Sequence, residues 1–298
     1  MTFRHIRIFV TVCECGSATA AAKKLFIAQP SVSLAISELE KHYNVRLFDR
    51  ISRRLHITEA GKQLFDYGVH ILSLYSEMED CMKSRGSSDI LRVGTSITIG
   101  TRLLPDLVKR FEKIEPNAKI NAIIDNSESI EESIINGDID LGLIEGIAHM
   151  PQIIAEKFMD DELVLLCGGN HPLCTRSEVT LEELSGFDFI LREKGSATRE
   201  LFDSLLLVHN MSITPMWESI STSAIIGAIA QGIGISVLPY RLAEEDLEAG
   251  NIHRIPIKEL SLKRNFFIIY HQSKFFSETA KLFMDTVRKA KSYIPKIK

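Results

Sequence analysis

The chain has 298 residues, of which 45% are hydrophobic, and this size and composition suit a globular protein of about two domains. It contains no run of about 18 apolar residues, so the sequence predicts no membrane span. Glu14 and Gly16 interrupt the N-terminal segment too early for a secretory signal, which favours a location in the cytoplasm. The net charge of −4 is uneven: residues 1–62 hold ten lysines and arginines against five acidic residues, which favours a polyanion such as nucleic acid as their partner over a merely solubilising role.

The first 44 residues predict three short helices. Apolar residues at helical spacing predict the first helix, which we expect to end before Gly16. Ser17 is typical of a helix N-cap, and the small residues that follow it predict a tightly packed second helix. After a turn over residues 26–28, Pro30 suits the first position of a third helix, since it cannot stand inside one.

The third predicted helix has one apolar and one small, polar face. The apolar face comprises Val32, Ile36, Leu39 and Tyr43. Small hydroxyl and amide side chains on the other face allow close approach to the major groove, where Gln pairs with adenine and Ser with several base edges or phosphates. Two short helices joined by a turn, the second with a reading face, predict a helix-turn-helix, although an ordinary amphipathic surface helix fits this segment alone.

Residues 45–58 predict a β hairpin, because Leu55 and Ile57 alternate with polar residues. Arg50, Arg53 and Arg54 crowd its tip, where arginines can reach phosphates or a narrow minor groove. A solvated basic loop is the alternative.

These segments together resemble the winged helix-turn-helix of LysR-type transcriptional regulators, without a gap over about residues 1–65. The resemblance rests on Gly-Ser (16–17), Ala-Ala-Lys-Lys-Leu (21–25), Ala-Gln-Pro-Ser-Val-Ser (28–33), Leu-Phe-Asp-Arg (47–50) and Leu-His-Ile-Thr-Glu-Ala-Gly (55–61). The chain departs from the family pattern at Ala18, at Ala28 and at Leu34, which suits a thymine methyl better than guanine. The expected DNA-binding residues are Ser17, Gln29, Pro30, Ser31, Ser33, Leu34, Ser37, Lys41, Arg50, Arg53 and Arg54.

Residues 59–88 predict a long linker helix followed by a hinge. Its apolar stripe (Leu64, Ile71, Tyr75, Met78 and Met82) needs a surface to pack against. A second copy of the helix would provide that surface and would place two helix-turn-helix segments on a two-fold symmetric DNA site. Packing within one chain is the alternative.

Residues 89–298 predict an α/β domain. Strands near 90–94, 119–125 and 141–144 alternate with helices, which indicates a parallel sheet, and a second such unit follows from residue 163. A strand at 266–270 and a last helix should return to the first lobe, so we expect lobe I at about 89–162 and 267–298 and lobe II at about 163–266. The predicted fold class is therefore α/β: a winged helix-turn-helix and a long linker helix, then a two-lobed effector domain similar to periplasmic binding proteins.

Ligands of such folds bind at the carboxyl ends of the strands, where polar groups should gather. Glycine, hydroxyls and a cation at a helix N-terminus, as in residues 193–199, suit an anion, although they also suit capping alone. The stretch 192–199 is similar to one in family members linked to sulfur assimilation and carbon fixation. The expected effector-binding residues are Ser96, Ile97, Thr98, Ser127, Glu128, Glu145, Gly195, Ser196, Thr198, Arg199 and Thr222.

Three classes of function compete: a ligand-responsive DNA-binding regulator, a solute-binding protein without DNA regulation, and an enzyme. The basic segment 1–62 argues against a solute-binding protein. No catalytic constellation, cluster at metal-ligand spacing or phosphate loop favours an enzyme. We expect no cofactor and no metal, and the scattered cysteines leave open only a redox role for Cys167 and Cys174. The expected partners are promoter DNA, a small anionic effector and further copies of the chain, with tetramers and RNA polymerase contacts implied by the resemblance.

Overall fold

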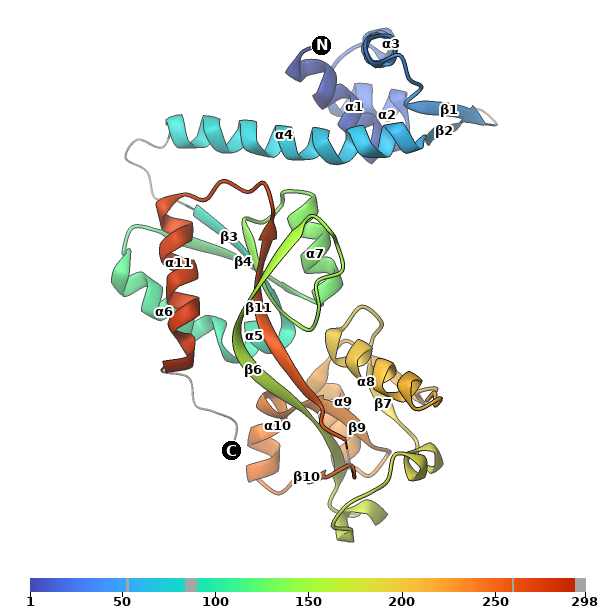
Figure 1. The fold of residues 1–298 in the computed structure, drawn as a ribbon, viewed down its shortest axis with the longest axis vertical. Coiled ribbons are helices and arrows are strands. Elements are labelled where there is room, and N and C mark those ends of the chain that lie inside the picture. Colours follow the sequence, from blue (N-terminus) through green and yellow to red (C-terminus); the bar gives the residue numbers. More distant parts are fainter. Residues whose placement is uncertain (52–53, 84–89, 259, 293–298) are drawn as a thin grey trace. The chain divides into compact units, whose positions relative to one another are not determined.

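The computed structural model describes residues 1–51, 54–83, 90–258 and 260–292. The chain forms two compact units, Met1–Ser87 with Ile135–Asp138, and Ser88–Ile134 with Ile139–Lys298. Figure 1 shows helices and a small hairpin in the first unit and a long, curled sheet with flanking helices in the second. None of the helices in these described ranges is long and apolar enough to cross a membrane.

The first unit begins with the three expected short helices. Gly16 ends the first helix in a left-handed conformation (φ 61°), and the Ser17 hydroxyl accepts a hydrogen bond from the Ala20 N–H at the start of the second. Pro30 occupies the first turn of the third. The unit comprises α1 (Phe3–Cys15), α2 (Ala18–Lys24), α3 (Gln29–Tyr43), the antiparallel strands β1 (Phe48–Ile51) and β2 (Arg54–Ile57), and α4 (Glu59–Lys83).

Part of the apolar stripe of the linker helix α4 packs inside its own chain. Leu64, Phe65 and Leu72 pack against the core formed by Ile6 and Phe9 of α1. The Tyr75 ring lies 4.9 Å from the Phe3 ring between centroids. Packing within one chain, the alternative left open above, therefore covers this part of the stripe, and pairing with a second copy stays a prediction. Met78 is exposed, and Met82 lies where side chains are not described.

The second unit is built on a mixed sheet in the order β10-β6-β11-β5-β3-β4, with β9 also paired to β6. The strands β3, β4 and β5 are parallel, as predicted, whereas β6 and β11 run antiparallel to their neighbours. The strands are β3 (Ile90–Ser96), β4 (Lys119–Asp125), β5 (Leu141–Glu145), β6 (Ile153–Gly168), β9 (Ser236–Pro239), β10 (Ile252–Ile255) and β11 (Lys263–His271). A separate parallel pair comprises β7 (Ile190–Arg192) and β8 (Trp217–Ser219).

Two lobes share the long strands β6 and β11 (Figure 1). We call the first lobe the part around the core of Leu107, Phe111 and Phe283, and the second lobe the part around the cores of Phe189, Phe202 and Ile229. The first lobe carries α5 (Ile97–Arg102), α6 (Leu104–Ile114), α7 (Ser127–Ile135) and α11 (Glu278–Arg288), and the second α8 (Ala197–Val208), α9 (Thr222–Ala230) and α10 (Tyr240–Glu248).

Three sequence predictions need correction. The strand expected from residue 163 begins at Ile153, because charged residues along 156–162 hide its first half from an apolar pattern. The sequence did not predict α5, α10 or β10, and β9 and β10 pair with β6 in antiparallel fashion. Tyr43 is 42% exposed rather than part of the buried face of α3, where Ala35 is buried instead.

Candidate functional site

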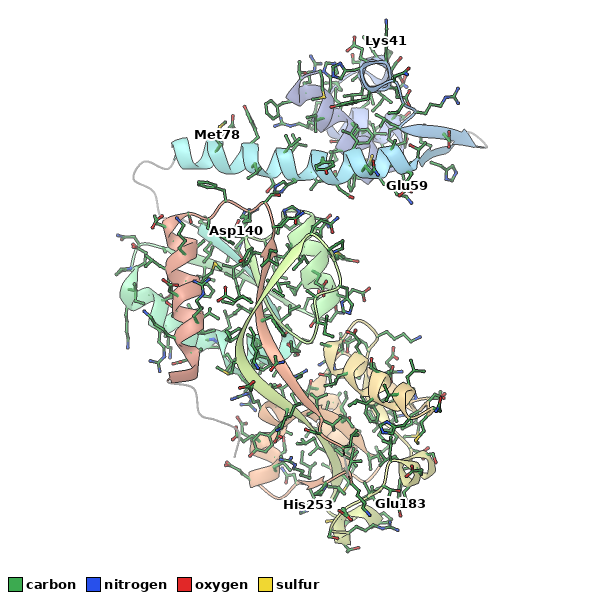
Figure 2. All side chains as sticks on the ribbon, in the orientation of Figure 1. Lys41, Glu59, Met78, Asp140, Glu183 and His253 are labelled. Atoms are coloured by element: carbon green, nitrogen blue, oxygen red, sulfur yellow. The ribbon has the colours of Figure 1, made fainter. Side chains whose placement is uncertain are left out.

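The outward face of α3 is small, polar and partly apolar. Gln29, Pro30, Ser37 and Lys41 are exposed, and Leu34 is 60% exposed (Lys41 is labelled in Figure 2). The Gln29 side-chain amide donates a hydrogen bond to the Ser33 hydroxyl at 2.8 Å. Ser31 and Ser33 are half-buried, so the tip of the helix presents mainly an amide, a proline ring and a leucine.

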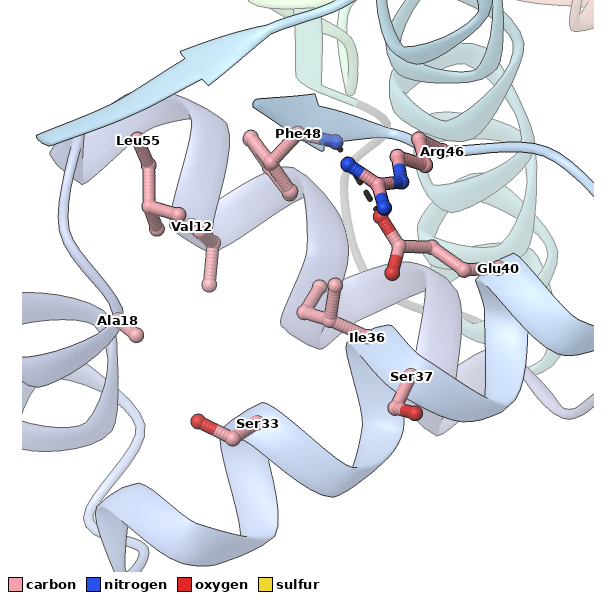
Figure 3. Close-up of a pocket in the computed structure, with 9 residues that line it drawn as sticks. All are labelled: Val12, Ala18, Ser33, Ile36, Ser37, Glu40, Arg46, Phe48 and Leu55. Atoms are coloured by element: carbon pink, nitrogen blue, oxygen red, sulfur yellow. Dashed lines mark hydrogen bonds between the residues drawn. The ribbon is translucent and has the colours of Figure 1, made fainter. Parts of the chain in front are cut away.

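A pocket of about 430 Å³ separates α3 from the β1–β2 hairpin (Figure 3). Ser33 and Ser37 line it from the helix, and Phe48 and Leu55 line it from the hairpin. The carboxylate of Glu40 accepts hydrogen bonds from the backbone N–H groups of Leu47 and Phe48, at 2.8 Å and 3.3 Å. One side chain of α3 therefore holds the first strand of the hairpin in place. The pocket is lined by Val12, Ala18, Ser33, Ile36, Ser37, Glu40, Arg46, Phe48 and Leu55.

The remaining predicted DNA-binding residues lie on several elements. The Ser17 hydroxyl is used in capping α2. Arg50 and Arg54 occupy the paired strands, opposite Leu55 and Ile51 respectively. Arg53 lies outside the described residues.

In the second unit, polar side chains converge on Glu145, the last residue of β5, which is 3% exposed. The hydroxyls of Ser96 and Thr98 donate to its carboxylate, Thr98 at 2.9 Å. The Ser127 hydroxyl donates to the Glu145 backbone carbonyl at 3.4 Å. These four residues were predicted for the effector site, and the parallel strands bring them to one edge of the sheet.

Arg264 of β11 joins this group to the second lobe. Its guanidinium donates to the Thr98 hydroxyl at 3.1 Å and to the Thr198 hydroxyl at 3.0 Å, and its Nε donates to Asp161 at 2.7 Å. One of its nitrogens also lies 3.4 Å from the Glu145 carboxylate. Arg264 is 5% exposed, so an arginine that the sequence analysis missed contacts predicted residues of both lobes.

The charges in this cluster are balanced. Arg241 lies 3.3 Å from the second carboxylate oxygen of Asp161, which makes two guanidinium groups against two carboxylates. Burial is the largest influence on Glu145 and raises the pKa of its carboxyl, while the positive charge of Arg264 opposes that shift. A neutral Glu145 would leave the cluster with excess positive charge.

The loop before α8 supplies the other predicted residues. Gly195 adopts a left-handed conformation (φ +85°), and its backbone carbonyl accepts from the Glu128 N–H at 3.4 Å. The left-handed conformation favours glycine at this position, and a Cβ would also stand 2.4 Å from the end of the Glu128 side chain, which would have to move. Ser196 is buried at the N-cap of α8.

Arg199 already has protein partners. Its guanidinium donates to Asp203 at 2.7 Å, to Glu218 at 3.1 Å and to the backbone carbonyl of Arg192 at 3.2 Å. The cation nearest the converging hydroxyls is therefore Arg264 rather than Arg199. Ile97 is the first residue of α5. The Thr222 hydroxyl at the start of α9 is buried and has no hydrogen-bond partner among the described residues.

The sequence around Arg264 gives only an ambiguous indication that its side chain points into the protein. Residues 263–271 alternate polar and apolar only in part, and the inward position of Arg264 follows from its pairing with Asp161 on β6. Because that pairing joins segments far apart in the chain, no local pattern reveals it.

The part of the chain that the structure describes contains no group of three or more His, Cys, Asp or Glu side chains placed to hold a metal ion. Cys167 is fully buried, and burial raises the pKa of its thiol to about 11, with Cys174 adding to the shift. A thiol with so high a pKa is mostly protonated at neutral pH, which disfavours the redox role left open for this pair.

Two parts of the chain match known protein families. Residues 3–62 match the "Bacterial regulatory helix-turn-helix protein, lysR family", and residues 84–292 match the "LysR substrate binding domain". The "Uncharacterized HTH-type transcriptional regulator YeiE" of Escherichia coli is 34% identical over 285 residues, which is 96% of each protein. The HTH-type transcriptional regulator CysL of Bacillus subtilis is 31% identical over 272 residues, 91% of each protein.

Among solved structures, the regulatory domain of CcmR from Synechocystis, in complex with 2-PG, is similar with a TM-score of 0.65 and 26% sequence identity. The similarity covers 70% of this chain and all of that domain.

Proposed function

The chain belongs to the LysR-type transcriptional regulators, DNA-binding proteins with an effector-binding domain, and we propose that it controls a promoter in response to a small anion bound between its two lobes. The observation that carries the anion proposal is the position of Arg264, whose guanidinium contacts hydroxyls at the N-termini of α5 and α8. Membership of this family argues against the alternative function, a solute-binding protein without DNA regulation. We also propose that the protein is not an enzyme.

We assign DNA binding to residues 1–58, linkage to 59–88 and effector binding to 89–298. The exposed face of α3 would enter the major groove, with Gln29 at base edges and Lys41 near the backbone. Ser33 and Ser37 line the pocket between α3 and the hairpin, where the sugar–phosphate strand beside the major groove would pass. Arg50, Arg53 and Arg54 would reach phosphates or the adjacent minor groove.

The anion would bind to the hydroxyls of Ser96, Thr98 and Thr198 and to the free N–H groups at the start of α8, next to Arg264. Since Arg264 already bonds to hydroxyls of both lobes, a ligand that takes over these hydroxyls changes what holds the lobes together. The family relatives support a small ligand in this domain, because the similar CcmR domain was solved with 2-PG.

We propose that the protein acts in the cytoplasm as a dimer or tetramer. Exposed apolar side chains remain for such contacts at Met78 on α4, at Ile123 and Ile124 on the edge strand β4, and at Leu207 and Val208 on α8. Contact with RNA polymerase follows from the family resemblance and is part of the same proposal.

The test combines DNA selection with thermal unfolding. Purified protein is used to select fragments from genomic DNA, and unfolding is followed with sulfur oxyanions, phosphates and organic acids. An anion at 100 times its dissociation constant should stabilise the protein by about 2.7 kcal/mol, and that stabilisation should disappear in Arg264→Gln. No stabilisation by any anion would overturn the anion proposal while leaving DNA selection intact.

A further inference from the structure

Phe26, in the turn between α2 and α3, occupies a backbone position that usually belongs to glycine. Its N–H donates to the Lys23 carbonyl at 3.2 Å, and the Ile27 N–H donates to the Ala22 carbonyl at 3.0 Å. These two bonds form a Schellman motif, whose residue after the helix end is left-handed and is commonly Gly or Asn. Phe26 has φ 55°, a conformation that is unfavourable for a bulky side chain.

Packing does not explain the phenylalanine. Its side chain is 95% exposed, so the ring has almost no contact with the rest of the protein. The next residue, Ile27, packs against the core around Ala22 and fixes the turn from inside. The backbone is therefore strained at a residue whose aromatic ring is exposed to solvent. Strained residues of this kind cluster at functional sites.

The position of the turn indicates what the ring contacts. Phe26 stands three residues before Gln29, at the N-terminal end of α3, whose exposed face also carries Pro30 and Leu34. In a helix-turn-helix the N-terminal residues of the reading helix approach the base edges in the major groove. The one apolar group that the major groove offers is the thymine methyl, which phenylalanine contacts favourably.

We propose that Phe26 is a DNA-contacting specificity residue whose ring packs on a thymine methyl group in the operator. The inference rests on the proposed role of α3 as the reading helix. It adds an apolar contact to the hydrogen bonds assigned to Gln29 and gives a reason for an aromatic residue where the backbone favours glycine or asparagine.

The test uses operator fragments selected with the wild-type protein. Binding of the wild type and of Phe26→Asn is measured on the operator and on versions in which single thymidines are replaced by deoxyuridine, which lacks the methyl. We expect Phe26→Asn to bind the operator about tenfold more weakly, equivalent to about 1.4 kcal/mol. At one thymidine, the replacement should weaken wild-type binding about fourfold, as expected for one buried methyl group, and should not affect Phe26→Asn.

Two controls separate this contact from folding and assembly. Asparagine tolerates the left-handed conformation, so Phe26→Asn should unfold at the same or a higher temperature than the wild type. Phe275→Asn removes another exposed phenylalanine, 83% exposed in the second unit, and should leave operator binding unchanged.

Unchanged operator binding by Phe26→Asn would overturn the proposal. Equal sensitivity of wild type and variant to every deoxyuridine replacement would overturn the methyl contact. A sedimentation coefficient of Phe26→Asn that differs from that of the wild type would mean that the ring contacts a second chain instead. If the wild type selects no DNA at all, the proposed function itself fails, which is a different result.

Discussion

Thr98 and Thr198 lie in different lobes of the second unit, and a single guanidinium, that of Arg264, donates hydrogen bonds to both hydroxyls. The three side chains are buried, so loss of either hydrogen bond would leave a buried polar group without its partner. An effector that displaces Arg264 from one threonine would therefore alter the contact between the lobes, which is the change that a regulatory domain has to transmit.

Replacing Thr198 by valine should destabilise the free protein. The change leaves a buried donor of Arg264 without its acceptor, at a cost of about 1–3 kcal/mol. Thr222→Val is the matched control: the Thr222 hydroxyl is buried and has no partner in the described part of the chain, so its removal should cost nothing or stabilise slightly. Urea unfolding of both variants measures the difference, and equal stability of the two would contradict the assigned role of the Arg264–Thr198 bond.

Glu145→Gln should remove a pH dependence of stability. Burial raises the pKa of Glu145, so the folded state binds this proton more tightly than the unfolded state. The wild type should then lose stability relative to Glu145→Gln as the pH rises from the ordinary value of 4.5 through the raised pKa. Unfolding curves at several pH values check this sign.

The same replacement should strengthen anion binding at pH values where Glu145 of the wild type is ionised. The ionised carboxylate of Glu145 cancels one positive charge of the cluster, and glutamine keeps the shape without the charge. In the wild type, anion affinity should therefore rise as the pH falls, and in Glu145→Gln it should vary less with pH. An anion that binds both proteins equally at every pH would place its site away from Glu145.

His149 provides a second pH-dependent link between the lobes. Its Nε2 lies 2.7 Å from Glu200 of α8, and its Nδ1 lies 3.2 Å from the buried Glu131 of α7. Glu200 is the main cause of a raised pKa for His149, with burial opposing it. The stabilisation is complete below the ordinary pKa of 6.5 and disappears as the pH rises through the raised value.

The difference in unfolding free energy between wild type and His149→Gln should accordingly be larger at about pH 6 than at about pH 9. Glu200→Gln should abolish most of that difference, because it removes the principal partner. A difference that does not change over this range would show that His149 contributes by packing alone.

The sequence predicts local features of this fold well, because their causes are local. Gly16 and Ser17 mark a helix end and a helix start, and the strand at 119–125 has the predicted bounds. The hydroxyls of Ser96 and Thr98 were predicted together because parallel strands end at one edge. Arg264 and Asp161 were missed, since their meeting depends on the antiparallel pairing of β6 with β11, which no short pattern encodes.

Gly61→Ala should destabilise the first unit, although alanine normally favours a helix over glycine by about 1 kcal/mol. Gly61 stands in the first turn of α4, where a Cβ would lie 2.3 Å from the Leu47 carbonyl oxygen and 2.7 Å from a side-chain carbon of Ile57. The first of these is backbone and cannot rotate away, so the helix would have to separate from the hairpin residues. We expect a lower unfolding temperature and weaker DNA binding, because the hairpin would lose its position beside α3.

Gly68→Ala in the same helix is the control for Gly61→Ala. Its Cβ would meet only side-chain carbons of Val10 and Ile6, at 3.0 Å and 3.2 Å, which can shift by a few tenths of an ångström. Gly68→Ala should therefore destabilise less than Gly61→Ala, or stabilise through the helix preference of alanine. If Gly61→Ala instead raises the unfolding temperature at full DNA affinity, the close contact between α4 and the hairpin does not position the DNA-binding surface.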